Sequence, residues 1–169
     1  IIAVILAMIR TLIFELINEI RIHIKSKINK FRVNKQIITK LDKYDYFGYH
    51  NLNELLNILY KQFVEIQKAW MNFDYDKLKT LCTDELFESY KSDLEVLKKK
   101  NGKNIMKFFI KRDIYIKDIE KNDDHYIIDL VLDVAFFDYV IDENTKSVIR
   151  GKKMSLIGNK YSLQFYCYD

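Results

Sequence analysis

Apolar residues recur at helical spacing in the segment that follows Asn51. Side chains three or four positions apart lie on the same face of a helix. Asn51 can accept the first free backbone N–H of such a helix, and Glu54 can complete a capping box. The pattern predicts a long helix that begins after Asn51, with an apolar face made of Leu52, Leu55, Leu56, Leu59, Phe63, Ile66, Trp70 and Phe73.

Two shorter helices are predicted next along the chain. Asp74 can cap one that runs through Leu81, and Thr83 can cap another whose first turn is acidic. Three lysines at 98–100 suit the negative end of that helix dipole, and the Asn-Gly pair at 101–102 ends the helix. Its apolar face consists of Leu86, Tyr90, Leu94 and Leu97.

Beyond Asn104 the apolar residues alternate with polar ones, which indicates strands. In the clearest strand Asp129 and Asp133 point outward, and the inward residues are Ile128, Leu130, Leu132, Val134 and Phe136. Turns are predicted at 122–124 and 142–145, and the Gly158-Asn159 pair is typical of a hairpin. Three helices packed on a curved antiparallel sheet of about four strands belong to the α+β class.

The N-terminus opens with an unbroken apolar run at residues 1–9, IIAVILAMI. The run covers less than half of a bilayer core of about 30 Å. Extending it would bury Arg10, Glu15 and Glu19, at roughly 3 kcal/mol for each charge. Residues 1–24 are therefore predicted to be either the end of a transmembrane helix or an amphipathic helix on the membrane surface. A core helix of the domain is the alternative. Because the first residue is Ile, we expect further sequence upstream.

The net charge of +4 is unevenly distributed. Residues 1–50 hold nine Lys and Arg against four Asp and Glu, whereas residues 51–169 hold nineteen against twenty. Basic residues beside an apolar segment favour the cytoplasmic side and attract anionic lipid. We therefore predict a basic linker at 25–50, although an ordinary solvated linker would have the same composition. The predicted membrane-binding residues are Arg10, Arg21, Lys25, Lys27, Lys30, Arg32 and Lys35.

Motifs for catalysis, metal binding or cofactor binding are not apparent. The four glycines are scattered, and the three histidines belong to no catalytic order. Cys82 and Cys167 form no CxxC or Cys/His pair, so we expect reduced thiols in or near a core. No catalytic residue, metal or cofactor is predicted. Nucleic-acid binding is not expected either, because residues 51–169 are slightly acidic.

A group of aromatic side chains could line a cavity between the helices and the sheet. Simple core packing is the alternative for the same residues. The predicted strand register keeps Asp129 and Asp133 outside such a cavity, and an enzyme on this fold would require an Asp or His inside it. The predicted cavity-lining residues are Trp70, Phe73, Tyr90, Phe136 and Tyr139.

The segment from Phe63 to the strands resembles a known family. The residues that carry the resemblance are Gln67, Ala69, Trp70, Asp74, Leu78, Leu81, Thr83, Asp84, Glu85, Leu86, Tyr90, Leu94, Asn101 and Asn104, with the VIRG run at 148–151. The pattern over about residues 51–168 is similar to the C-terminal domain of the forty-four-kilodalton subunit of the mitochondrial inner-membrane translocase, in its bacterial membrane-anchored form.

The resemblance implies a cone-shaped α+β fold like that of nuclear transport factor two, in a domain at 51–169. It also implies a scaffolding role at anionic, cardiolipin-type membranes, with no catalytic motif. We therefore expect a non-enzymatic adaptor at the cell membrane, single-pass or peripheral, with a cytoplasmic domain and a protein partner from a translocation or membrane complex. An enzyme on the same fold and a ribosome- or RNA-associated protein are the alternatives.

Overall fold

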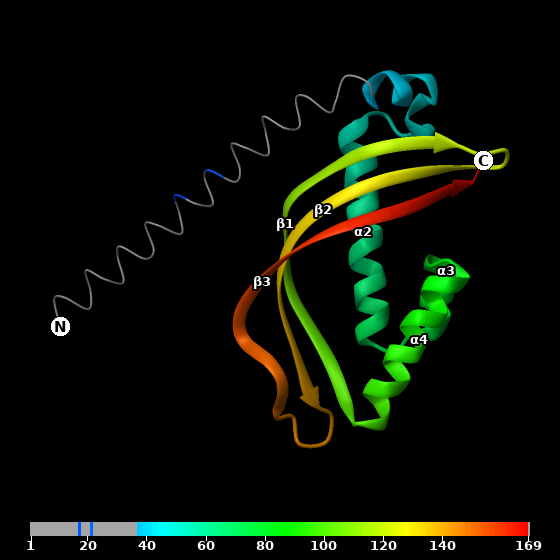
Figure 1. Cartoon of the computed structure of the whole chain (residues 1–169). Coiled ribbons are helices and arrows are strands. Elements are labelled where there is room, and N and C mark those ends of the chain that lie inside the picture. Colours follow the sequence, from blue (N-terminus) through cyan, green and yellow to red (C-terminus); the bar gives the residue numbers. More distant parts are fainter. Residues whose placement is uncertain (1–16, 18–20, 22–36, 169) are drawn as a thin grey trace.

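The computed structural model describes Ile17, Arg21 and residues 37–168 of the chain. Residues 37–43 are helical. The elements that follow are η1 (Asp45–Gly48), α2 (Leu52–Met71), α3 (Tyr75–Leu81), α4 (Asp84–Lys99), β1 (Gly102–Lys121), β2 (His125–Asp142) and β3 (Val148–Tyr168). The strands are long and curve around the helices (Figure 1). The order of helices followed by antiparallel strands confirms the predicted α+β class.

The helices begin where their capping residues predict. The Asn51 side chain accepts a hydrogen bond from the Glu54 N–H at 3.1 Å, and the Glu54 carboxylate accepts one from the His50 N–H at 2.9 Å. Glu54 therefore bonds the residue before the cap rather than the Asn51 N–H, so the predicted capping box is only half formed. The Asn51 bond satisfies a backbone donor that lacks a partner in the first turn. Asp74 and Thr83 cap α3 and α4 in the same way through their side-chain oxygens. Local chemistry therefore sets the start of all three helices.

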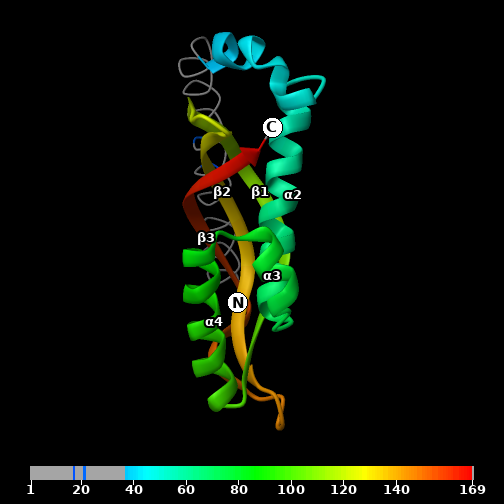
Figure 2. The same cartoon turned by 90° about the vertical axis from the view of Figure 1, so that its right-hand side faces the viewer.

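The sheet has the order β1-β2-β3, and both pairings are antiparallel. Figure 2 views the molecule from the helical side, with the strands behind the helices. The inward residues of β2 alternate as predicted and are almost fully buried from Ile128 to Phe136. They form the main core together with apolar residues of α2, including Leu55, Leu59 and Phe63.

The prediction of about four strands was wrong, because the Gly158-Asn159 pair does not form a hairpin. β3 runs straight through it, with Gly158 opposite Ala135 and Asn159 opposite Val134. Gly158 serves a different purpose: a Cβ there would lie 2.5 Å from a guanidinium nitrogen of Arg112. The glycine leaves room for that side chain, and pairing along the whole of β2 overrides the local turn signal.

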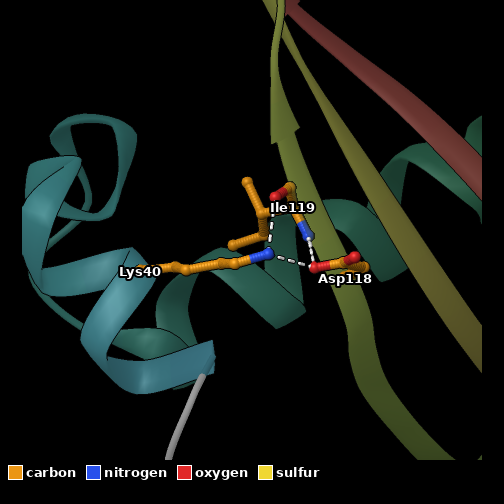
Figure 3. Close-up of polar contacts among 3 residues, drawn as sticks. All are labelled: Lys40, Asp118 and Ile119. Atoms are coloured by element: carbon orange, nitrogen blue, oxygen red, sulfur yellow. Dashed lines mark hydrogen bonds and ion pairs between the residues drawn. The ribbon is translucent and has the colours of Figure 1, made fainter.

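Part of the predicted basic linker belongs to the folded domain. Ile37 and Leu41 are buried in the same core cluster as the apolar face of α2. The Lys40 ammonium bonds the Asp118 carboxylate at 2.5 Å and the Ile119 carbonyl at 3.1 Å (Figure 3). The fold therefore begins at or before Ile37 rather than at Asn51.

Aromatic packing further fixes this entry segment against the sheet. The rings of Tyr44 and Phe47 each lie 4.9 Å from the ring of Tyr126 on β2. Such aromatic pairs add to the stability gained from buried area alone. The segment from Ile37 to the start of α2 is thus held by apolar burial, an ion pair and ring contacts.

The predicted hydrophobic N-terminal helix lies outside the described residues, apart from two positions. Ile17 and Arg21 are helical and exposed. Among the residues that the structure describes, no helix has the length and apolar content needed to cross a bilayer.

Candidate functional site

A cavity of about 340 Å³ lies between α2, the start of α4 and β3. Phe63 and Gln67 of α2 form one side, and residues from the α3–α4 junction to Tyr90 form another. β3 contributes the remaining side, including Tyr161 and Leu163. Every residue that lines this cavity is apolar or uncharged. We call it the β3 cavity.

Burial favours the neutral forms of three side chains in the β3 cavity, Tyr90, Tyr161 and Cys82. It raises the pKa of the Tyr90 hydroxyl, and that of the Tyr161 hydroxyl for the same reason. Burial also raises the pKa of the Cys82 thiol, which disfavours the reactive thiolate. At neutral pH the cavity therefore offers hydroxyl and amide groups within an apolar wall. This chemistry suits an apolar group and provides no charged acid or base.

The five aromatic residues that were predicted to line one cavity do not all border the same cavity. Tyr90 lines the β3 cavity, whereas Trp70 lines a second cavity of about 440 Å³ between α4 and the start of β3. Phe136 and Tyr139 are buried in the sheet, whereas Phe73 packs with Trp70 and Tyr90 in a small cluster between the helices. The structure brings no two of the five together in either cavity.

The carboxylates of β2 lie on both faces of the sheet. Asp129 and Asp133 occupy the face opposite the inward residues Ile128 to Phe136, and Asp129 accepts a hydrogen bond from Gln164 at 2.9 Å. Asp138 follows the inward alternation, and its buried Oδ1 has no hydrogen-bond partner among the described residues. The inward residues predicted from the sequence end at Phe136, although the alternation of inward positions continues to Asp138. Asp138 does not line the β3 cavity.

The predicted membrane-binding residues fall almost entirely outside the described part of the chain. Arg21 is described, and it is exposed on a helical turn. The structure also shows that Lys40, within the predicted linker, is engaged by Asp118. The predicted residues outside the described ranges are Arg10, Lys25, Lys27, Lys30, Arg32 and Lys35.

These features define a class of protein: a small α+β domain with helices on the concave side of an open antiparallel sheet and an uncharged cavity between them. A family model described as the Tim44-like domain matches residues 49–165, which is more than half of the chain. The chain belongs to the Tim44-like family, and the resemblance inferred from the sequence is confirmed. No curated protein matches the chain.

Membership of this family indicates the general type of function. Tim44-like domains are generally non-catalytic and associated with translocases. The family therefore indicates a membrane-associated scaffold related to protein translocation. The match begins at Tyr49, so the buried residues Ile37 and Leu41 are an N-terminal addition to the matched region.

Proposed function

We propose that this protein is a non-catalytic, membrane-tethered adaptor. Residues 1–36 hold it at an anionic bilayer of the cell membrane, and the Tim44-like domain faces the cytoplasm, where it binds a protein of a translocation or membrane complex. The observation that carries the proposal is the Tim44-like domain at 49–165, preceded by a segment that is both apolar and basic.

The charge distribution supports a membrane-binding segment ahead of a separate domain, also when the folded domain is taken to begin at Ile37. Residues 1–36 contain seven basic and two acidic residues, whereas residues 37–168 contain twenty-one of each. Every excess positive charge therefore lies ahead of the described domain. A basic residue at an anionic surface contributes about 1 kcal/mol to binding. The segment before Ile37 can thus bind anionic lipid without help from the domain.

The character of the β3 cavity supports an adaptor rather than an enzyme. General acid–base catalysis needs a group that gains or loses a proton near the working pH. The raised pKa values of Tyr90, Tyr161 and Cys82 move these groups further from neutral pH. Asp138 lies outside the cavity lining. The cavity favours binding over chemistry.

Vesicle flotation of the full chain tests the membrane role. The test variant replaces five basic residues by Gln: Lys25, Lys27, Lys30, Arg32 and Lys35. The matched control replaces five exposed lysines of the domain by Gln: Lys98, Lys99, Lys100, Lys152 and Lys153.

We expect the test variant to lose binding to vesicles that contain cardiolipin, and the control to keep it. Added salt should weaken the wild-type binding, because the screening length is about 8 Å at 0.15 M. Equal binding by the test variant and the wild type would show that the basic segment does not engage lipid. Loss of binding by the control instead would assign membrane contact to the domain.

A further inference from the structure

The outer edge of β3 is regular along residues 156–168. In the described sheet β3 has a neighbouring strand only on its β2 side. Its register with β2 has no shift between the pair Tyr168–His125 and the pair Leu156–Phe137. A regular edge presents a row of backbone N–H and C=O groups, which is a template for an additional strand.

The other edge of the sheet is built differently. The register of β1 with β2 shifts at three places: between Lys107 and Ile110, between Lys111 and Asp113, and between Ile116 and Asp118. Such bulges interrupt an edge and protect it from pairing. α2 also packs mainly against β1 rather than β3. Of the two edges, β3 is the one suited to accept a strand.

The β3 cavity opens at this regular edge. Its lining includes the consecutive residues Leu163, Gln164, Phe165 and Tyr166. Successive side chains of a strand point to opposite faces, so consecutive residues line one hollow only where the strand edge borders it. The facing wall includes Leu86 at the start of α4. A strand added beside β3 would therefore send every second side chain into an uncharged cavity.

The charges of β3 indicate the chemistry of the added strand. β3 carries Lys160 within the regular edge and Arg150, Lys152 and Lys153 just before it, and it has no Asp or Glu between Val148 and Tyr168. A second copy of β3 would bring only positive charges to the edge, which is destabilising for paired strands. An acidic segment would be attracted instead, and it would gain affinity from the backbone hydrogen bonds.

We propose that the regular edge of β3 binds an extended segment of a partner protein in which acidic and apolar residues alternate. The segment adds a fourth strand to the sheet, its apolar side chains enter the β3 cavity, and its acidic side chains lie toward the basic residues of β3. This inference rests on the proposed adaptor function and specifies how the adaptor binds its protein partner.

Peptide binding to the full chain in mild detergent tests the proposal. The probe is a short fluorescent peptide that alternates glutamate with leucine, and binding is measured by fluorescence anisotropy. One control peptide carries N-methyl groups on alternate backbone nitrogens, and another replaces glutamate by lysine. We expect both controls to bind about tenfold more weakly or worse, because several backbone hydrogen bonds or all favourable charge pairs are lost.

Two variants with matched controls locate the binding site. Leu86→Trp narrows the cavity, and its control is Val96→Trp on the same helix, because the Leu86 and Val96 side chains are 39% and 50% exposed. Lys160→Gln removes the positive charge within the regular edge of β3 without placing a carboxylate opposite Asp133, and its control is Lys107→Gln on β1. Each test variant should weaken binding about fivefold or more, and each control less than about twofold. Lys160 is exposed, so its variant remains informative if Leu86→Trp fails to fold.

Protection of backbone amides from hydrogen exchange identifies the occupant of the edge. The alternating peptide should protect amides in 156–168. Equal binding of the N-methylated peptide would overturn the proposal. It would also be overturned if a dimer of this chain, or cardiolipin vesicles without peptide, protected the edge and the peptide failed to displace them. The peptide assay contains no vesicles, so it tests strand addition at β3 separately from membrane binding. If the flotation experiment failed, the peptide result could still be interpreted.

Discussion

Leu41 allows a direct test of whether the chain folds from Ile37 onward. Its side chain is 0% exposed and belongs to the same core cluster as Leu55 and Phe63 of α2. Leu41→Ala removes buried methyl groups and leaves a space that neighbouring atoms fill only in part. Such substitutions cost about 2–5 kcal/mol. We expect about 3 kcal/mol here, because a short helix at the start of the fold can move inward and relieve part of the loss.

Ile38 provides the matched control for this substitution. It lies on the same helical turn, but its side chain is 38% exposed. Ile38→Ala should cost about 1 kcal/mol, since much of this side chain remains in contact with water in the folded state. Urea unfolding of both variants, followed by circular dichroism, gives the two free energies. The slope of unfolding free energy against urea should stay unchanged if the variants keep the same fold.

The difference between the two variants decides the question. If Leu41→Ala cost no more than Ile38→Ala, the helical turn at 37–43 would not be packed in solution, and the folded domain would begin near Asn51 as the sequence first indicated. A shift of about 3 kcal/mol is a large part of the 5–15 kcal/mol that stabilises an ordinary domain. It is therefore well above the error of a urea titration.

Three further predictions follow from strain, charge and burial. Gly151→Ala should lower the free energy of unfolding by about 3 kcal/mol, because φ is +79° and a Cβ would lie 2.7 Å from a backbone oxygen of β2. The control Gly48→Ala has φ +78° but open space around the Cβ, so it should cost about 1 kcal/mol in the same urea titration. Equal costs would disprove the clash at Gly151. The Lys40 ammonium lowers the pKa of the Asp118 carboxyl in the folded chain. The ion pair therefore stabilises the fold fully above the pKa of an unfolded Asp, about 3.9, and this stabilisation is lost as the pH falls through the lower pKa of Asp118 in the folded state. Lys40→Met should raise the Asp118 pKa in an NMR titration and cost less than about 1 kcal/mol, because both side chains are 43% exposed, and an unchanged pKa would contradict the ion pair. Burial raises the pKa of the Cys82 thiol, so iodoacetamide at pH 7 should modify it more slowly in the folded chain than in urea, as measured by mass spectrometry, and equal rates would show that the thiol is not shielded.

The parts of the fold that depend on local chemistry were predictable from the sequence. The helix starts at Asn51, Asp74 and Thr83 rest on bonds to residues a few positions away, which the sequence shows directly. The strand alternation of β2 was equally clear. The prediction of a hairpin at Gly158-Asn159 was wrong because a glycine at such a position has two possible roles. It can form a turn, or it can leave room for a side chain of another strand. Only the position of Arg112 distinguishes these uses, and that position depends on the sheet as a whole.

The candidate site was less predictable, because it depends on which elements face each other. Helical spacing placed Trp70 and Tyr90 on apolar faces, but it did not show that they border different cavities. The place of Tyr161 beside Tyr90 in the β3 cavity depends on β3 being one continuous strand. To find Asp138, the inward alternation of β2 had to be followed one step beyond Phe136, the last inward residue that was predicted.

The docked entry segment also limits how far the domain can stand from the bilayer. Even if residues 1–24 alone contacted the bilayer, the connector would consist of residues 25–36, and twelve extended residues span about 40 Å. Lipid contact by the basic residues at 25–35 would shorten this reach. Burial of Leu41 and the Lys40–Asp118 pair prevent residues 37–43 from extending that reach. The substitution that removes the Leu41 contact would therefore weaken the fold and release additional connector. Stability of the domain and its distance from the membrane are coupled through the same short helical turn.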